Sequence, residues 1–300
     1  MTQDLRPFGR LLTAMVTPFG QDGSLDADGV QKLATYLVDE QRNDALVISG
    51  TGGESPTTTD AEKETLIRAV REAVGDRAKI VAGVGTNDTR HTIELAIAAE
   101  KAGAHGLLVV TPYYNKPPQA GLVRHFTDVA DATGLPVLVY DIPHRAGIAI
   151  DTETMVRIAE HERIVGVKDA KADLAATAWV LRRTDLAYYC GDDALTLPML
   201  AVGGVGVVGT SSHLTGVGTK QMIEAYERGD VAEALRLHRA LLPLFTGIFR
   251  TQGTILVKAG LRALGLPAGP VRSPLVDATE AETNQLLEDA AAAGQHLGTN

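Results

Sequence analysis

Residues 106–110 read Gly-Leu-Leu-Val-Val, and the loop residues Thr111-Pro112-Tyr113-Tyr114 follow directly. Apart from the glycine, every residue of this run is aliphatic, and polar and apolar side chains do not alternate. A strand of a parallel sheet is covered on both faces, so its sequence is close to continuously apolar. Residues 106–110 therefore predict a buried parallel strand that ends at a polar loop.

Similar apolar runs occur on both sides of this one, at residues 11–17, 45–49, 79–83, 136–140, 164–168, 187–190 and 206–210. Several of the intervening segments place apolar residues at helical spacing, notably residues 26–40, 59–74, 92–102 and 120–133. A doubly wound sheet usually has fewer strands than eight. Eight strands with intervening helices predict an α/β protein built as a (β/α)8 TIM barrel.

Beyond residue 210 the pattern becomes wholly helical, with predicted helices over residues 219–227, 230–249, 254–263 and 279–293. Closing the barrel needs only one of these helices. We therefore expect residues 1–224 to form the barrel and residues 225–300 to form a C-terminal helical extension.

Composition excludes several classes of function. The 300 residues include 28 Lys and Arg against 37 Asp and Glu, a net charge of −9, which argues against binding nucleic acid or an anionic membrane. Cys190 is the single cysteine, so an internal disulfide and a cysteine-rich metal site are both excluded. No apolar run approaches the ~18 residues of a membrane span, and the first ten residues lack the apolar core of a secretory signal. We expect a cytoplasmic enzyme.

The carboxyl ends of barrel strands carry the active site in this architecture, and Lys168 closes the run at residues 164–167. A lysine buried there is expected to have a lowered pKa, which leaves some free amine to attack a carbonyl. The alternative is that Lys168 begins a surface loop, since Asp169 and Lys171 follow it. Position alone does not decide between the two.

Tyr113, Tyr114 and Tyr140 follow or end the fourth and fifth predicted strands. Phenols near an amine can carry protons during imine formation, especially through a bridging hydroxyl such as that of Thr51. For any single tyrosine, packing with a hydrogen-bonded hydroxyl is the competing interpretation.

Residues 50–55, Gly-Thr-Gly-Gly-Glu-Ser, form a glycine-rich turn whose amides could bind a carboxylate or phosphate. The segment lacks the Gly-Lys-Ser/Thr of a nucleotide-binding loop, and a plain tight turn is the alternative. Arg145, just past the fifth strand, could bind a second carboxylate through two hydrogen bonds. A solvated loop arginine is the simpler interpretation.

Other motifs argue against alternative chemistries. Residues 204–209 have the glycine spacing of a dinucleotide site, but they coincide with a predicted strand rather than a strand-to-helix turn. Asp192-Asp193 has no third metal ligand at a suitable spacing, and neither a His-Glu-x-x-His nor a Gly-x-Ser-x-Gly motif is present. Carbonyl chemistry without a metal or organic cofactor is what these exclusions leave.

The chain resembles the dihydrodipicolinate synthase family, in the N-acetylneuraminate lyase superfamily of class I aldolases. The resemblance covers roughly residues 9–290 and depends on six segments taken together. These are residues 14–19 (Ala-Met-Val-Thr-Pro-Phe), 50–55, 111–117 (Thr-Pro-Tyr-Tyr-Asn-Lys-Pro), 140–147 (Tyr-Asp-Ile-Pro-His-Arg-Ala-Gly), 167–170 (Val-Lys-Asp-Ala) and 191–193 (Gly-Asp-Asp).

The resemblance implies a catalytic set. Lys168 would form a Schiff base with pyruvate, and Tyr140 would carry protons. Thr51 would relay those protons to Tyr114, which in this family reaches in from the neighbouring subunit of a dimer. The homotetramer common in the family, a dimer of dimers, is the expected assembly.

The resemblance also implies a binding set. The amides of Thr51 and Gly52 would hold the pyruvate carboxylate, Arg145 would bind the carboxylate of aspartate-4-semialdehyde, and Val208 is the remaining expected substrate contact. The implied reaction joins these two substrates on the route to lysine and diaminopimelate.

Three departures from the family pattern leave other functions open. Gly52 stands where the family has a threonine that contacts the keto-acid carboxylate, His144 replaces a small residue, and Gly209-Thr210 replaces Ser-Val. The glycine could weaken pyruvate binding, loosen the turn or admit a larger keto acid. An aldolase acting on another substrate pair and a catalytically weak paralogue are therefore the alternatives.

Feedback by lysine is a further point on which the sequence departs from some relatives. Family members that lysine inhibits have histidines after the glycine-rich motif, where this chain has Asp60 and Lys63. We therefore expect insensitivity to physiological lysine.

Overall fold

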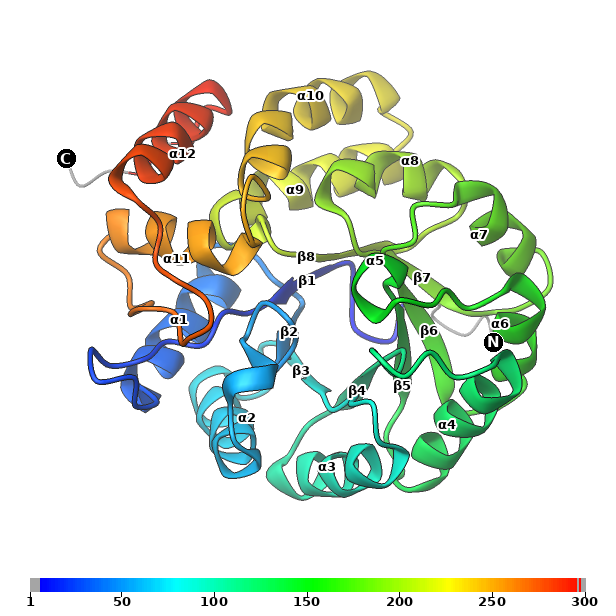
Figure 1. Cartoon of the computed structure of the whole chain (residues 1–300). Coiled ribbons are helices and arrows are strands. Elements are labelled where there is room, and N and C mark those ends of the chain that lie inside the picture. The colour runs from blue at the N-terminus through cyan, green and yellow to red at the C-terminus, as the bar shows by residue number, and fades with distance from the viewer. Residues whose placement is uncertain (1–5, 296, 298–300) are drawn as a thin grey trace.

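A computed structural model describes residues 6–295 and 297. Eight parallel strands form a closed barrel in sequence order, and β1 pairs with β8 to complete it (Figure 1). The strands are β1 (Leu11–Ala14), β2 (Ala45–Ile48), β3 (Lys79–Gly83), β4 (Gly106–Val110), β5 (Val137–Asp141), β6 (Ile164–Asp169), β7 (Ala187–Cys190) and β8 (Gly206–Gly209). The predicted (β/α)8 barrel is confirmed.

Helices surround the barrel and continue beyond it (Figure 1). They are α1 (Ala27–Asp39), η1 (Ser55–Thr57), α2 (Asp60–Val74), α3 (Thr89–Ala102), α4 (Gln119–Asp131), α5 (Pro143–Ala146), α6 (Thr152–Ile158), α7 (Leu174–Leu181), η2 (Asp193–Leu195), α8 (Thr196–Ala201), α9 (Ser212–Glu227), α10 (Val231–Gly247), α11 (Gly253–Ala263) and α12 (Glu280–Ala292). The elements η1 and η2 are short 3₁₀ helices.

Local sequence explains where several helices begin. The Asp26 side chain accepts a hydrogen bond from the Gly29 amide at the start of α1. Thr59 and Glu62 form a capping box at the start of α2, each bonding the other's backbone amide. Such caps satisfy amides that have no partner inside the helix, so these predicted boundaries agree with the structure to within a residue.

The start of α9 was predicted wrongly. The helix begins at Ser212, whereas the sequence pattern placed its start at Thr219. Residues 211–215 are polar for the most part, yet Ser211, Ser212 and His213 are fully buried. Their polar atoms are satisfied internally, since Ser211 bonds Asp193 and His213 accepts the Val16 amide. A buried hydrogen-bonded helix turn therefore has the composition of a loop.

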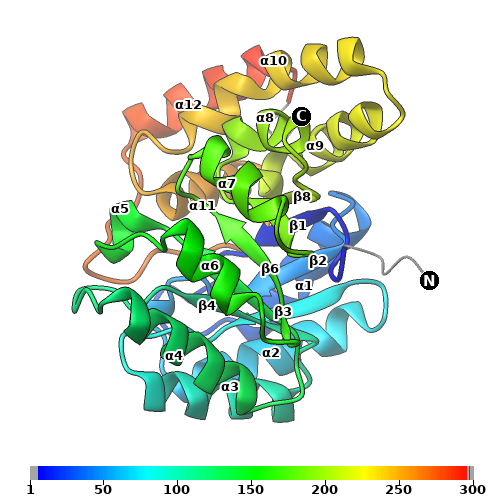
Figure 2. The same cartoon turned by 90° about the vertical axis from the view of Figure 1, so that its right-hand side faces the viewer.

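In the part of the chain that the structure describes, three helices follow α9. Helix α10 packs against α9 and α12, and α11 contacts both α9 and α12. Figure 2 shows α10 and α12 together on one side of the molecule, opposite α2, α3 and α4. Residue 225, the expected boundary of the extension, lies in the last turn of α9, and the division of the chain there stays a prediction.

The barrel interior is filled by side chains from alternating strand positions, among them Leu12, Val47, Leu108, Leu138 and Val208. The larger core cluster lies mainly between the strands and the surrounding helices and includes Leu33, Ile80 and Phe126. Within residues 6–295 and 297, no helix combines the length and the apolar character needed to cross a membrane.

Candidate active site

Lys168 and Tyr140 lie side by side on neighbouring strands. The register of β5 and β6 pairs the two residues directly, and the Lys168 Nζ atom lies 4.1 Å from the centroid of the Tyr140 ring. Each residue is 5% exposed. This burial contradicts the alternative in which Lys168 begins a surface loop.

The Lys168 amine has no carboxylate within ion-pair distance in the described part of the chain. Strand alternation turns the next residue, Asp169, toward the helices, where its carboxylate accepts hydrogen bonds from the Thr177 hydroxyl and the Lys171 amide. Because Asp169 is engaged elsewhere, the amine is not held by a counter-ion.

A cavity of about 470 Å³ lies at the carboxyl ends of the strands and contains this pair. Its walls bring together five of the predicted site residues, namely Thr51, Gly52, Tyr140, Arg145 and Lys168. No hydrogen bond joins the hydroxyls of Thr51 and Tyr140 among the described residues. The cavity therefore combines a buried amine, a phenol, a glycine-rich turn and a cation.

Backbone hydrogen bonds within residues 50–55 engage three amides, and of the amides that remain only those of Thr51 and Gly52 belong to residues that line the cavity. The amides of Gly53 and Ser55 donate to the Gly50 carbonyl, and the Glu54 amide donates to the Thr51 carbonyl. The amides of Thr51 and Gly52 have no partner among the described residues. Both residues line the cavity, so the turn offers two N–H donors beside the amine, which suits a carboxylate.

Two predicted site residues lie outside the cavity wall. Tyr114 is 88% exposed, and its backbone has a φ of 75°, in the left-handed region. Val208 is fully buried in the barrel interior with Leu12 and Tyr189. Within one chain the structure therefore does not bring Tyr114 to Lys168, and Val208 contributes packing beneath the cavity.

Arg145 belongs to α5, a short helix over the opening of the barrel (Figure 1). The segment that follows α5 is held by Asp141, whose carboxylate accepts the Ile150 amide at 3.3 Å and lies 3.3 Å from the Lys171 Nζ atom. Burial raises the pKa of Asp141 to about 6, and the Lys171 ammonium opposes that shift. Asp141 therefore supports the loop that presents Arg145.

Asp192 and Asp193 have structural roles. Asp193 is buried and accepts hydrogen bonds from the Thr210 and Ser211 amides and the Ser211 hydroxyl. Asp192 caps η2 through the Ala194 amide. The described residues contain no group of three or more His, Cys, Asp or Glu side chains placed to hold a metal ion.

The C-terminal helices contribute part of the cavity wall that the sequence did not predict. These residues are Phe245, Thr246, Phe249, Thr251, Gln252, Gly253 and Thr254. Another unpredicted feature is a buried ion pair between Glu54, in the glycine-rich turn, and Lys258 of α11, 2.7 Å apart. A lone charge inside the apolar run Ile255 to Ala259 was the available signal for Lys258.

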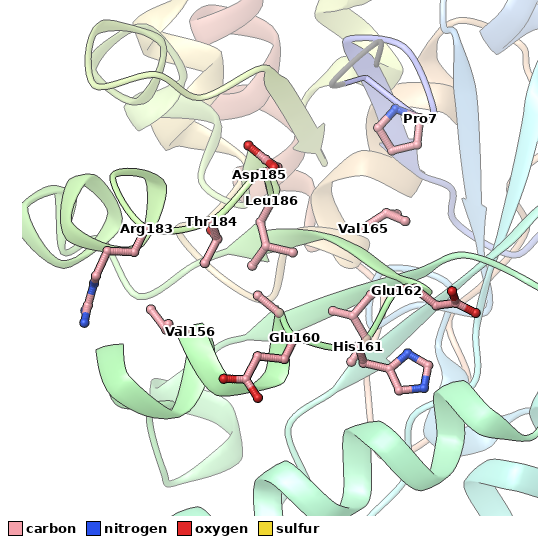
Figure 3. A pocket seen from close by; sticks show the side chains of 12 residues that line it. Pro7, Val156, Glu160, His161, Glu162, Val165, Arg183, Thr184, Asp185 and Leu186 are labelled. Carbon is pink, nitrogen blue, oxygen red and sulfur yellow. The ribbon is translucent and has the colours of Figure 1, made fainter. Parts of the chain in front are cut away.

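A second cavity, of about 610 Å³, lies near the amino ends of β6 and β7 (Figure 3). Its polar side chains include Glu160, His161 and Arg183. His161 bonds Asp131 and Arg183 pairs with Glu153, and these contacts are at the surface. Because the described residues that line this larger cavity include no buried reactive group, the smaller cavity is the candidate active site.

A closed (β/α)8 barrel with a buried amine at the carboxyl ends of its strands is the architecture of a lyase of the class I aldolase type. Residues 7–293 match the model of the dihydrodipicolinate synthetase family, and the chain belongs to that family.

Named relatives and a solved structure agree with this assignment. The chain is 72% identical to 4-hydroxy-tetrahydrodipicolinate synthase of Acidothermus cellulolyticus, over 98% of this chain and 96% of the relative. It is 61% identical to 4-hydroxy-tetrahydrodipicolinate synthase 2 of Streptomyces coelicolor, over 97% of each chain. Among solved structures, dihydrodipicolinate synthase from Cyanidioschyzon merolae with lysine bound is similar at a TM-score of 0.93 and 43% identity, covering 96% of this chain and 99% of that one.

Proposed function

We propose that this chain condenses pyruvate with L-aspartate-4-semialdehyde to 4-hydroxy-tetrahydrodipicolinate, a step toward lysine and diaminopimelate. The observation that carries the proposal is the buried Lys168 amine, without a counter-ion, beside two free amides in one cavity. The two relatives reported above are named as 4-hydroxy-tetrahydrodipicolinate synthases, which supports this proposal. We propose that the enzyme acts in the cytoplasm.

The first half of the reaction uses Lys168 and the glycine-rich turn. The Lys168 amine attacks the keto carbon of pyruvate, and loss of water gives an imine. The amides of Thr51 and Gly52 bind the carboxylate and fix the keto carbon beside the amine. A base then removes a proton from the methyl group, which yields an enamine. The Tyr140 phenol, with its ring against Lys168, is the group placed to move these protons.

The second half uses the opening of the cavity. Arg145 binds the carboxylate of the aldehyde substrate and aligns its carbonyl carbon with the enamine. The enamine carbon forms a bond to that carbon, and the aldehyde oxygen takes up a proton. The amino group of the new chain then attacks the imine carbon and releases Lys168 as the ring closes. The lysine amine supplies the electrophilic activation, so these steps use no metal or organic cofactor.

The exposed Tyr114 completes the site from a neighbouring subunit. Its side chain projects from the 111–117 loop at 88% exposure, and its left-handed backbone holds it there although tyrosine rarely adopts that conformation. A second copy that buries this side chain would deliver its hydroxyl toward Thr51. We propose a homotetramer, a dimer of dimers, in which Tyr114 crosses between subunits.

Gly52 supports pyruvate rather than a larger keto acid. A Cβ atom at this position would lie 2.8 Å from the Ala14 carbonyl oxygen, which is too close for an ordinary contact. The position of the absent side chain is therefore filled by strand β1, and its absence opens no space there. Glycine lets the turn approach β1 closely.

We propose that the enzyme is insensitive to physiological lysine. The Lys63 side chain is 12% exposed, and its Nζ atom donates to the Thr58 carbonyl at 2.5 Å. In the family pattern described above, inhibited relatives have a histidine at the position of Lys63, so this chain has a bonded ammonium there instead. Half-inhibition below millimolar lysine in a titration of turnover would overturn this.

Borohydride trapping tests the proposed chemistry directly. The protein is incubated with pyruvate and borohydride, its intact mass is measured and the modified peptide is mapped. A reduced imine adds about 72 Da, and we expect it on Lys168. Turnover with aspartate-4-semialdehyde, against a panel of other aldehydes, then tests the second substrate. No adduct at saturating pyruvate would overturn the proposal, and trapping of larger keto acids alone would support an altered substrate.

A further inference from the structure

The middle of the glycine-rich turn is held by hydroxyls from two other parts of the chain. Thr254, the second residue of α11, donates from its Oγ1 atom to the Gly52 carbonyl at 3.0 Å. Thr17, just after β1, donates to the Gly53 carbonyl at 2.7 Å. Both threonines are buried. Two successive carbonyls of the turn are therefore fixed, one of them by a helix some two hundred residues further along the chain.

The end of the turn is held by a buried charge pair. Glu54 has a left-handed backbone and is 3% exposed. One carboxylate oxygen lies 2.7 Å from the Nζ atom of Lys258, which is itself fully buried, and the other accepts the Arg272 amide at 2.8 Å. Lys258 also donates to the Pro270 carbonyl. Glu54 is therefore held by an ion pair with helix α11 and by a hydrogen bond from the loop that follows α11.

The turn needs such support because of its own composition. Gly52 and Gly53 have no side chains to restrict their backbone, and glycine has the widest choice of conformations. A hydrogen bond weakens steeply as its donor turns away from the acceptor. The two free amides thus bind a carboxylate well only if contacts from outside fix the turn.

We propose that Thr254 and Lys258 are positioning residues that hold the turn at residues 50–54, so that the C-terminal extension sets the affinity of the site for its keto acid. The inference depends on the proposed function, since it assumes that these amides bind the keto-acid carboxylate. Thr254 fixes the peptide group that follows the Gly52 amide, and Lys258 fixes the residue where the turn ends. Neither residue is required to touch the reacting carbon, so their effect falls on binding rather than on the chemical step.

The first test is Thr254→Val, which keeps the shape of the side chain and removes the hydroxyl. The pyruvate concentration that gives half-maximal borohydride trapping on Lys168 is measured, along with kcat and KM for both substrates. We expect KM for pyruvate and the trapping midpoint to rise about tenfold, as for loss of one hydrogen bond, while kcat and KM for the aldehyde stay within about twofold. Thr254→Ser, which restores the hydroxyl, should return both values toward those of the unaltered protein.

Thr127→Val is the matched control, because Thr127 also donates to a backbone carbonyl, that of Val123, but lies on α4 away from the cavity. This control should leave KM for pyruvate and the trapping midpoint unchanged. The paired substitution Glu54→Gln with Lys258→Met removes the charge pair without stranding either charge, and it should also raise KM for pyruvate.

The outcomes separate this inference from the proposed function. If the unaltered protein forms no pyruvate adduct, the proposed function fails. If the unaltered protein forms the adduct and Thr254→Val gives the same trapping midpoint, or lowers only kcat or the melting temperature, the positioning role is overturned while the proposed function stands.

Discussion

Two lysines of this chain are buried against aromatic rings, and their surroundings differ in one respect. Lys168 on β6 lies 4.1 Å from the centroid of the Tyr140 ring, and Lys258 on α11 lies 4.4 Å from that of Phe19. Lys258 has the Glu54 carboxylate and the Pro270 carbonyl as partners. Burial lowers the pKa of Lys258, and the Glu54 carboxylate opposes that shift. Lys168 has neither kind of partner among the described residues.

The difference shows that burial alone does not make a lysine reactive. The Glu54 carboxylate favours the charged form of Lys258 and occupies its ammonium in an ion pair. An amine that faces a cavity without a counter-ion is free to attack a carbonyl. This difference supports the proposal that Lys168 is the nucleophile and that Lys258 stabilises the structure, although both side chains are buried and lie against an aromatic ring.

The largest effect is expected from Lys168→Met. Removal of the proposed nucleophile should lower turnover by about 10⁴-fold or more and abolish the borohydride adduct, with little loss of melting temperature because no ion pair is broken. Turnover, intact mass and thermal unfolding are measured on the same preparation. Lys101→Met, at an exposed position on α3, is the control. An adduct that persists in Lys168→Met would break the comparison.

The second effect is expected from Lys258→Met, and it falls on stability. Removing one partner leaves the Glu54 carboxylate buried without a counter-ion, which costs about 3–5 kcal/mol. Denaturant unfolding should show the loss, and the paired substitution with Glu54→Gln should recover much of it. Equal stability of Lys258→Met and the unaltered protein would show that the ion pair is not what distinguishes this lysine.

Tyr140→Phe tests the ring contact of Lys168 separately from the phenol. The aromatic face stays against the amine and only the hydroxyl is lost, so burial of Lys168 is preserved. We expect turnover to fall by about 10²-fold while Lys168 is still trapped, at a slower rate, by pyruvate and borohydride. Unchanged turnover would show that the Tyr140 hydroxyl does not carry protons in the reaction.

The smallest effect is expected on stability at acid pH, from the pair of Glu62 with Arg272, whose backbone amide also bonds Glu54. Hydrogen bonding to Arg272 lowers the pKa of Glu62 from its usual value near 4.5 to about 2. A lowered acid pKa contributes stability that is complete above about pH 4.5 and is lost as the pH falls toward 2. Because Glu62 is partly exposed, the contribution is under about 1 kcal/mol.

The measurement is the melting temperature of the unaltered protein and of Glu62→Gln at pH 6 and near pH 3. The difference between the two proteins should be larger at pH 6 and shrink near pH 3. A difference that does not change with pH would show that the Arg272 contact leaves the acid stability unaffected.

The strands show how much of the fold the sequence could predict. All eight were predicted within a few residues, because strands covered on both faces must be apolar throughout. The start of α9 was not predicted, because the buried polar residues there make hydrogen bonds to residues that are distant in the sequence. Such long-range contacts leave no local pattern.

The amino-acid sequence by itself determined the barrel, the strand-end position of Lys168 and the glycine-rich turn, since these follow from apolar runs and from motifs read along the chain. Tertiary structure alone decided which of the two buried lysines has a carboxylate partner among the described residues and which has none. Helix α11 returns to the turn at residues 50–54 and supplies Thr254 and Lys258, while strand alternation turns Asp169 away from Lys168. A side chain's charge partners come from whatever the fold places beside it, and sequence spacing does not record that.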